Sequence, residues 1–382
     1  MPTLRSLAAT STPGGKAARH EGEVSTCACL PASDSVLSGG WDGTLRLWKG
    51  VAGTPAASLK VGDKPVSACA VSPDESQWLS GNLDGMLSRW DPITQTQTST
   101  FLAHTRPISA IRFSPDGRIV ATASWDRNLI LWDVEHEREG RALSGHTDIV
   151  AGCAFTPDGR MLLSWSNDSS LRLWDVPRVR RIGTLEGHAD RVTAAAISPD
   201  GRWTASGSRD GAVKLWDLST RTEAGCLGGG KEIKGCFFLL DGESLLVVEA
   251  DGRLSLYAVP GLEEGPSLET MVNVICADCS SSGSYVALGT QDGRIERVLV
   301  EGLESTPLIA RATPTTRRTA SALQRLFGRS RITPAFACTC PTCRHPFEMD
   351  GEKPAVRTVC PKCRRPLRLY APPTDSQPAA VR

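Results

Sequence analysis

Four cysteines near the C-terminus have the spacing of a metal site. Cys340 and Cys343 form one Cys-x-x-Cys pair, Cys360 and Cys363 form a second, and sixteen residues separate the pairs. Two such pairs on short hairpins place four thiolates around a zinc ion at about 2.3 Å, and a module this small lacks a sufficient core without the metal. Four thiolates leave no position for a water ligand, so we expect one structural Zn²⁺ per chain and no metal-assisted hydrolysis.

The sequence around these cysteines, CPTCRHPFEMDGEKPAVRTVCPKCRRPLRLY, resembles the zinc-ribbon family. A thioredoxin-like redox site also contains Cys-x-x-Cys, but it needs a β-α-β unit that about thirty residues cannot supply. Cys338 and His345 are nearby side chains that could replace a ligand if the register differs.

A second set of residues occurs four times. Each copy has a His, a Ser or Thr eighteen residues later, an Asp four residues after that, and a Trp six residues further on. His, Ser and Asp also make up a hydrolytic triad, but repetition in four units argues against catalysis. A buried carboxylate needs compensating hydrogen bonds, which the other three side chains can supply. The copies are His20, Ser38, Asp42, Trp48; His104, Thr122, Asp126, Trp132; His146, Ser164, Asp168, Trp174; and His188, Ser206, Asp210, Trp216.

Two markers run through the chain with one period, so the chain contains a repeat. The aromatic marker is Trp48, Trp90, Trp132, Trp174 and Trp216 at intervals of forty-two residues, then Tyr257 and Val298 at intervals of forty-one. The turn marker lies six residues before each of these, at Asp42, Asp84, Asp126, Asp168, Asp210, Asp251 and Asp292. Short alternating stretches such as VTAAAISPDG and WTASGSRDG, separated by Asp-Gly turns, predict β-strands within each of the seven units.

A repeat of about forty residues that ends in Trp-Asp resembles the WD-repeat family, whose fold is a ring of four-stranded blades. The resemblance covers residues 16–310 and implies an all-β, seven-bladed β-propeller in which the four residue sets are structural tetrads. Unit two has Gly62 in the His position, and units six and seven have lost the hydroxyl, the His and the Trp. The strand that closes the ring comes either from the segment before His20 or from STPLIARA after unit seven, and the sequence does not decide between them.

Four regions are therefore expected: the propeller at 1–310, a basic linker at 311–337, the zinc-ribbon module at 338–370 and a disordered tail at 371–382. The linker contains six arginines and no acidic residue. Residues 1–310 carry 29 Lys and Arg against 38 Asp and Glu, whereas the remaining residues carry a net charge of +10. Charge is thus segregated between the two parts of the chain.

The residue before each turn aspartate is expected near the channel mouth, on the face that propellers of this family present to other proteins. These positions combine aromatic, apolar and Arg residues, a composition typical of interaction hot spots. They predict a partner-binding face made by Trp41, Leu83, Trp125, Asn167, Arg209 and Gln291, with Ala250 at the remaining position. The alternative is that Trp41 and Trp125 are covered by adjacent loops. Trp78 and Trp165 fit either the core or the rim.

Four further cysteines, Cys27, Cys69, Cys153 and Cys236, occupy equivalent positions of the first strand and are expected as small core residues. Cys27 with Cys29, and Cys276 with Cys279, form short motifs, but alternate strand residues point to opposite faces, so no joint metal or redox role is expected.

The sequence contains no secretory signal and no run of about eighteen apolar residues, and its odd cysteine count favours reduced thiols. We therefore expect a cytoplasmic, non-enzymatic scaffold that binds a protein of unknown identity, with the zinc module as a second contact. No small-molecule substrate and no membrane span are indicated. The alternative is a nucleic-acid-associated adaptor that uses the basic C-terminal tail.

Overall fold

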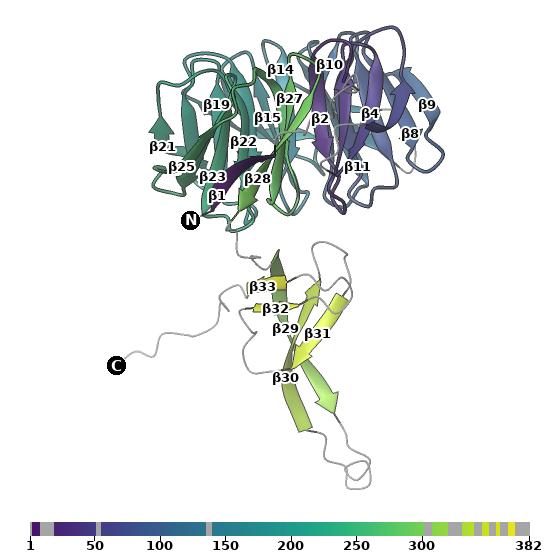
Figure 1. The fold of residues 1–382 in the computed structure, drawn as a ribbon. Helices are drawn as coiled ribbons and strands as arrows, with labels where there is room; N and C mark the ends of the chain where they lie inside the picture. The colour runs from purple at the N-terminus through teal and green to yellow at the C-terminus, as the bar shows by residue number, and fades with distance from the viewer. Residues whose placement is uncertain are drawn as a thin grey trace. The chain divides into compact units, whose positions relative to one another are not determined.

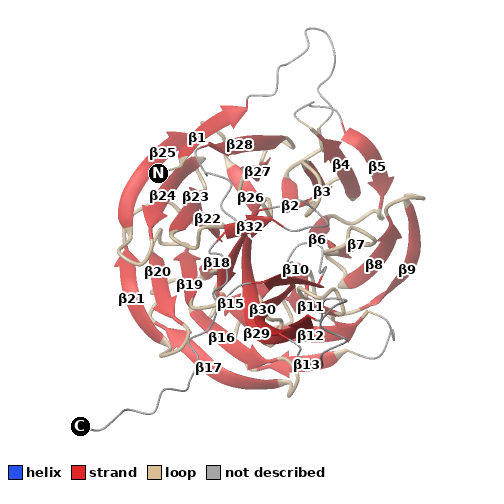
Figure 2. Cartoon of the chain, turned by 90° about the horizontal axis from the view of Figure 1, so that it is seen from below, coloured by secondary structure: helices blue, strands red, loops and turns tan. Residues whose placement is uncertain are grey.

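Each of the seven sequence units folds into a four-stranded antiparallel sheet, and the sheets follow one another around a ring (Figure 2). The computed structural model describes residues 2–7 (backbone only at 7), 19–50, 55–134 and 140–301, and the backbone of 308–319, 331–339, 346–350, 357–359 and 366–370. The chain divides into two compact units, residues 1–303 and 304–382. The predicted seven-bladed all-β propeller is therefore confirmed.

The first four blades contain consecutive strands, ordered from the channel outwards. They are β2 (Val24–Cys29), β3 (Ser35–Gly40), β4 (Thr44–Lys49) and β5 (Pro55–Lys60); β6 (Val66–Val71), β7 (Trp78–Asn82), β8 (Met86–Asp91) and β9 (Thr96–Leu102); β10 (Ile108–Phe113), β11 (Ile119–Ser124), β12 (Asn128–Asp133) and β13 (Arg141–Ser144); and β14 (Val150–Phe155), β15 (Met161–Ser166), β16 (Ser170–Asp175) and β17 (Arg180–Glu186).

The last three blades follow the same plan, except for the outermost strand of the seventh. They are β18 (Val192–Ile197), β19 (Trp203–Ser208), β20 (Val213–Asp217) and β21 (Thr222–Leu227); β22 (Ile233–Phe238), β23 (Ser244–Glu249), β24 (Arg253–Ala258) and β25 (Glu263–Glu269); and β26 (Val274–Cys279), β27 (Tyr285–Thr290), β28 (Ile295–Glu301) and β1 (Thr3–Leu7).

The N-terminal strand closes the ring. β1 pairs antiparallel with β28, with Thr3 opposite Glu301 and Leu7 opposite Arg297, and the two strands lie side by side in Figure 1. This decides between the two closing segments that the sequence left open. Of the other segment, residues 308–312 belong to β29 (Leu308–Thr319), which pairs within the second unit.

Apolar clusters lie between consecutive blades and hold the ring together. Leu129 and Leu131 of the third blade pack with Val150 and Leu162 of the fourth. Trp78 and Trp165, which fitted either core or rim, are 2% and 7% exposed and belong to such clusters. Burial of apolar surface between neighbours is therefore the main force that joins the blades.

A β-bulge recurs in the inner strand of every blade, and in four blades it joins that strand to the next blade. The pairing of the first two strands shifts register after the first residue of the inner strand in all seven blades. The residue at this bulge is unpaired, so its side chain is free to reach sideways. In four blades it is a hydroxyl that donates to a backbone carbonyl of the following blade: Ser25 to Val66, Ser67 to Ile108, Ser109 to Val150, and Thr193 to Ile233.

The second unit contains a five-stranded sheet in the order β31-β30-β29-β33-β32, with β30 (Arg331–Thr339), β31 (Pro346–Asp350), β32 (Arg357–Val359) and β33 (Pro366–Tyr370). β29 and β30 therefore overlap both ends of the segment 311–337, for which a linker was expected. Among the described residues, no helix is long and apolar enough to cross a membrane.

Candidate interaction face

The residue before each turn aspartate lies at one end of the blades, next to the start of the inner strand. We call these seven residues the tip residues. In six blades the tip amide donates a hydrogen bond to the residue just before that inner strand. The bonds run from Trp41 to Glu23, Trp125 to Pro107, Asn167 to Ile149, Arg209 to Arg191, Ala250 to Glu232 and Gln291 to Asn273, at 2.9–3.1 Å. This repeated contact places the tip residues on the same face of the ring.

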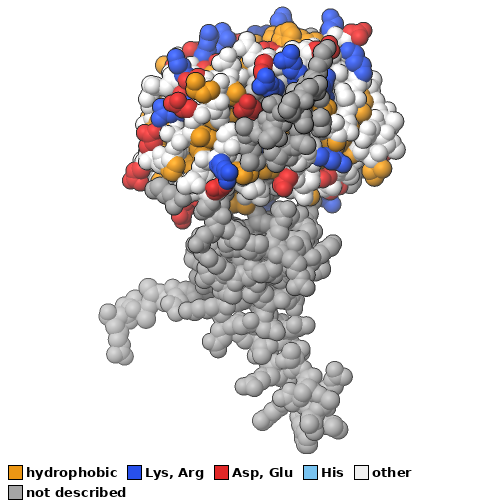
Figure 3. All heavy atoms as spheres, viewed as in Figure 1, with side chains coloured by type: hydrophobic (Ala, Val, Ile, Leu, Met, Phe, Trp, Pro, Cys, Tyr) orange, Lys and Arg blue, Asp and Glu red, His pale blue; other side chains and the backbone are white. Residues whose placement is uncertain are grey.

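Two aromatic tip side chains are exposed on this face. Trp41 is 51% exposed and Trp125 is 45% exposed, so neighbouring loops do not cover them. Arg209 and Gln291 are also exposed, whereas Leu83 and Asn167 are half-buried. Gln291 accepts a hydrogen bond from Asn273 at 3.3 Å. On the side of the propeller, by contrast, acidic and basic side chains are interspersed (Figure 3).

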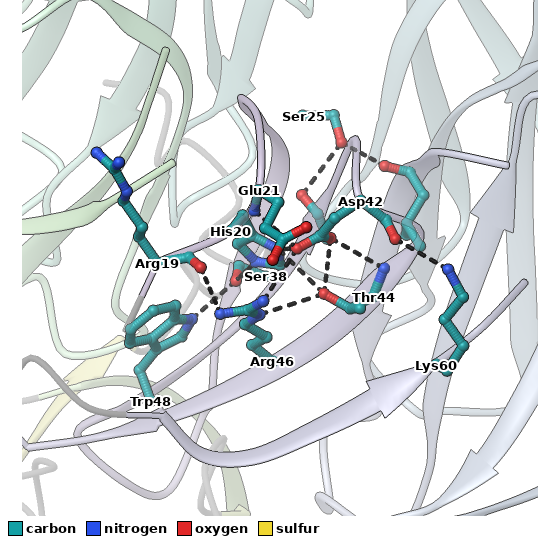
Figure 4. Close-up of polar contacts among 12 residues, drawn as sticks. Arg19, His20, Glu21, Ser25, Ser38, Asp42, Thr44, Arg46, Trp48 and Lys60 are labelled. Carbon is teal, nitrogen blue, oxygen red and sulfur yellow. Dashed lines mark hydrogen bonds and ion pairs between the residues drawn. The ribbon is translucent and has the colours of Figure 1, made fainter. Parts of the chain in front are cut away.

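The tip turn of the first blade is fixed by a buried polar network (Figure 4). His20 Nε2 lies 2.7 Å from Ser38 Oγ, and Trp48 Nε1 donates to the same oxygen at 2.8 Å. His20 Nδ1 lies 3.0 Å from Asp42 Oδ1. Asp42 also accepts bonds from the Thr44 hydroxyl at 2.7 Å, from the Glu21 amide at 3.0 Å, and from the Arg46 guanidinium at 3.0 Å.

The third and fourth blades repeat this network. In the fourth, His146 lies 2.8 Å from both Ser164 Oγ and Asp168 Oδ2, and Trp174 Nε1 donates to Ser164 at 2.9 Å. In the third, His104 lies 2.9 Å from Asp126 and 2.8 Å from Thr122, and Trp132 donates to Thr122 at 2.9 Å.

The hydrogen-bond pattern of the fourth blade is satisfied by a neutral histidine. Trp174 Nε1 can only donate, so Ser164 Oγ accepts that bond and is able to direct its own proton to His146 Nε2. A proton on His146 Nδ1 then faces the Asp168 carboxylate. Burial, the largest influence, lowers the pKa of His146 despite the opposing effect of Asp168. Burial raises the pKa of Asp168, but bonds from His146, Ser170 and Thr147 together hold it well below its usual range.

The fifth blade departs from the expected tetrad. His188 Nε2 lies 2.7 Å from Ser206 Oγ, and Trp216 donates to Ser206 at 2.8 Å. No bond joins His188 to Asp210, and His188 Nδ1 is buried without a partner in the described structure. Asp210 is exposed and accepts only amide and hydroxyl bonds of its own turn region. The loop following it contains Ala212, which lacks the hydroxyl that Thr44 and Ser170 use to orient the carboxylate.

The second blade keeps only part of the network. Trp90 Nε1 donates to Ser80 Oγ at 2.9 Å, and Gly62 provides no imidazole. Asn82 replaces the aspartate as the turn acceptor, because its Oδ1 accepts the amides of Asp84 and Met86, both at 3.0 Å. The exposed Asp84 therefore does not serve as the acceptor of the turn amides, although its position in the repeat predicts that role.

The inner cysteines are core residues, as expected. Cys27, Cys69, Cys153 and Cys236 are at most 5% exposed. Burial raises the pKa of Cys69, Cys153 and Cys236 to about 12, so these thiols are protonated at neutral pH. Within the described part of the chain, no group of three or more His, Cys, Asp or Glu residues is arranged to hold a metal ion.

The four predicted zinc ligands lie outside the described residues. The strands that flank them form two antiparallel hairpins: Thr339 pairs with Pro346 across the segment that contains Cys340 and Cys343, and Val359 pairs with Pro366 across the segment that contains Cys360 and Cys363. Each Cys-x-x-Cys pair therefore falls in the connection of a hairpin.

Comparison with known proteins agrees with this architecture. A family model described as the IFT122 first beta-propeller matches residues 65–298, and one described as the WD domain, G-beta repeat matches residues 14–49. No curated protein matches the chain. The first match spans more than half of the sequence, and the second covers the first three strands of the first blade. The chain therefore belongs to the IFT122 first beta-propeller family and is built from WD repeats.

Proposed function

We propose that this propeller is a protein-interaction scaffold and that its partner binds the tip residues. The observation that carries the proposal is the exposure of two tryptophans, Trp41 and Trp125, at equivalent positions of one face. Large aromatic side chains that remain half-exposed on a folded surface favour burial against another molecule, and Trp is enriched among binding hot spots. Leu83 stands at the tip position of the blade between them.

The turns that carry both tryptophans are ordered by hydrogen bonds. Trp41 precedes Asp42, whose carboxylate is held by His20, Thr44 and Arg46. Trp125 precedes Asp126, which is held by His104 at 2.9 Å and by the Asn128 amide at 3.0 Å. An anchor on a pre-ordered turn loses little conformational freedom when it binds. The tetrads thus support binding by fixing the backbone beneath the anchors.

Replacing both anchors should remove the partner. We expect the Trp41→Ala, Trp125→Ala double variant to retain the partner at least roughly tenfold less well than the intact protein in an affinity pull-down from native cytosol, because hot-spot truncations each cost about 2 kcal/mol or more. Both side chains are surface-exposed, so the fold should persist. Ile93→Ala is the matched control, because Ile93 is 91% exposed but lies outside the tip turns.

The same pull-down separates the two candidate functions. The net charge of +10 beyond residue 310 favours a nucleic-acid-associated adaptor as the second candidate. For the nucleic-acid adaptor, the double variant should retain the same partners as the intact protein, and nuclease treatment should remove them. Loss of one protein in the double variant, unaffected by nuclease, supports the scaffold.

We further propose that residues 338–370 bind one structural Zn²⁺ through Cys340, Cys343, Cys360 and Cys363 and form a second contact of the scaffold. The hairpin pairings on either side of both Cys-x-x-Cys segments support this assignment, because zinc ribbons place their ligands in hairpin connections. The metal would supply folding energy to a small module and no catalysis. A cytoplasmic location, with its reduced thiols, stays a prediction.

Metal analysis tests the zinc site. The purified protein should contain one zinc ion per chain, and the Cys340→Ser, Cys360→Ser variant should lose it while the circular dichroism of the propeller is unchanged. Cys226→Ser is the control, since Cys226 is an exposed propeller thiol and its loss should leave the zinc content unaltered. Zinc retained by the double variant would show that these cysteines are not the ligands.

A further inference from the structure

We propose that Cys27 and Cys276 form a redox-modifiable dithiol, which hydrogen peroxide converts into a disulfide between the first and seventh blades. Cys27 lies on β2 and Cys276 on β26, the two inner strands that meet where the ring closes. Their sulfur atoms are 3.6 Å apart, although 249 residues separate them in the chain. In the described structure, no other two cysteine sulfurs are in hydrogen-bonding contact.

The other hydrogen bonds of these two sulfurs are weak. Apart from their mutual contact, Cys276 Sγ bonds to the Val24 carbonyl at 3.5 Å and Cys27 Sγ to the Ala287 carbonyl at 3.8 Å. Thiol bonds to carbonyls at these distances are weak. A disulfide requires the sulfurs to come within about 2.05 Å, so the pair must close by about 1.5 Å. The neighbouring Cys29 is instead directed to the Asp278 carbonyl at 3.4 Å.

A small oxidant has a path to the pair. Both cysteines line the central cavity of about 460 Å³ that runs along the inner strands. Cys276 is partly exposed, whereas Cys27 is 5% exposed. Hydrogen peroxide is little larger than water, so Cys276 is the thiol that it meets first.

The oxidation takes place in two steps. Cys276 Sγ attacks one peroxide oxygen, the O–O bond breaks, and the released hydroxide takes up the thiol proton to give water and a sulfenic acid. Cys27 Sγ then attacks the Cys276 sulfur, the S–OH bond breaks, and the departing hydroxide takes the proton of Cys27 to give a second water. Two thiols are oxidised and one peroxide is reduced. The contact with Cys276, followed by burial, raises the pKa of Cys27, so Cys27 is the resolving thiol and Cys276 the one that meets the peroxide.

The disulfide would make the ring closure covalent. The closure is otherwise held by hydrogen bonds and packing: Arg297 donates to the Asp34 and Trp48 carbonyls at 2.8 and 3.3 Å, and Tyr285 donates to the Ser35 carbonyl at 3.2 Å. A covalent link between residues 27 and 276 encloses almost the whole propeller in one loop. Such a long loop restricts the unfolded chain strongly, so the oxidised protein should be more stable.

Mass spectrometry of the full-length protein tests this directly. After treatment with hydrogen peroxide and alkylation of the remaining thiols, a non-reducing tryptic digest should contain peptides 20–46 and 254–294 joined with the loss of two hydrogens, and dithiothreitol should separate them. We expect the Tm of the oxidised protein to rise by roughly 5–10 °C. Oxidation of the exposed Cys226 reports that the dose was sufficient.

Each of the two peptides contains two cysteines, so the digest alone does not identify the linked sulfurs. Single-residue variants identify them. Cys27→Ser and Cys276→Ala should each abolish the cross-link and the Tm rise, whereas Cys29→Ser and Cys279→Ser should retain both. If one variant at the pair fails to fold, the other gives the same test. Oxidised Cys226 without the cross-link, or a cross-link that persists in Cys27→Ser, would overturn the proposal.

Discussion

Deleting residues 1–7 should lower the free energy of unfolding of the propeller by roughly 3–5 kcal/mol. The deletion removes β1, and with it five paired positions along β28. It also removes Leu4, which packs against the apolar cluster between the sixth and seventh blades. Urea unfolding followed by tryptophan fluorescence measures the loss. Because an unpaired edge strand is a template for association, β28 should also cause the truncated protein to self-associate in size-exclusion chromatography.

Two substitutions on the same strand separate packing from charge. Leu4→Asp should act almost like the deletion, since it places a carboxylate against the apolar cluster. Arg5→Ala should leave stability unchanged within error, because the Arg5–Glu301 pair spans 3.6 Å with side chains 69% and 47% exposed, and exposed ion pairs contribute little. A truncated protein with the same stability and the same elution volume as the intact one would mean that β1 does not close the ring.

Acidification from pH 6.5 to pH 4 should destabilise the propeller, with His188 responsible for the largest share. Burial, followed by the Lys214 charge, lowers the pKa of His188 to about 4, against an ordinary value of 6.5. Between these values the unfolded state binds a proton that the folded state does not bind. Stability is therefore fully present above pH 6.5, falls as the pH drops through this window, and levels off for this group below pH 4. The shift corresponds to up to roughly 3 kcal/mol.

His20, His104 and His146 contribute in the same direction, because burial lowers the pKa of each despite its aspartate partner. The tetrad aspartates, whose pKa is lowered, add a further loss at more acidic pH. Unfolding free energies measured at several pH values should therefore decline more gently below pH 6.5 in His188→Gln than in the intact protein.

His146→Gln is the matched comparison for this effect. It interrupts a complete tetrad and should lower stability at every pH, but it should leave most of the pH dependence between 4 and 6.5. An equal slope in His188→Gln and the intact protein would show that His188 is protonated in the folded state. Comparison of the two variants distinguishes two effects on stability: loss of a hydrogen-bonded network in His146→Gln, and loss of a group whose protonation is linked to unfolding in His188→Gln.

The structure contains contacts between residues that are close in the sequence and contacts between residues that are far apart in it, and only the first kind could be predicted from the repeat. The repeat spacing predicted the blades, the face that carries Trp41 and Trp125, and the networks of the first, third and fourth blades. It did so because each tetrad joins residues of one unit and its preceding loop, within twenty-eight positions of the chain. Contacts of this kind recur with the period and are visible as a pattern. The Ser and Thr residues at the bulges, from Ser25 to Thr193, recur in the same way and were a signal that sequence reasoning missed.

The contacts across the ring closure are not visible in the spacing. The choice of β1 as closing strand, the meeting of Cys27 with Cys276 and the Arg297 bonds join residues from the two ends of the propeller. The separation of His188 from Asp210 likewise depends on side chains packed in three dimensions and not on the spacing, which is the same as in the complete tetrads. The repeat therefore determined the blades. Ring closure, which brings together residues about 250 positions apart, and side-chain packing within the fifth blade determined the rest.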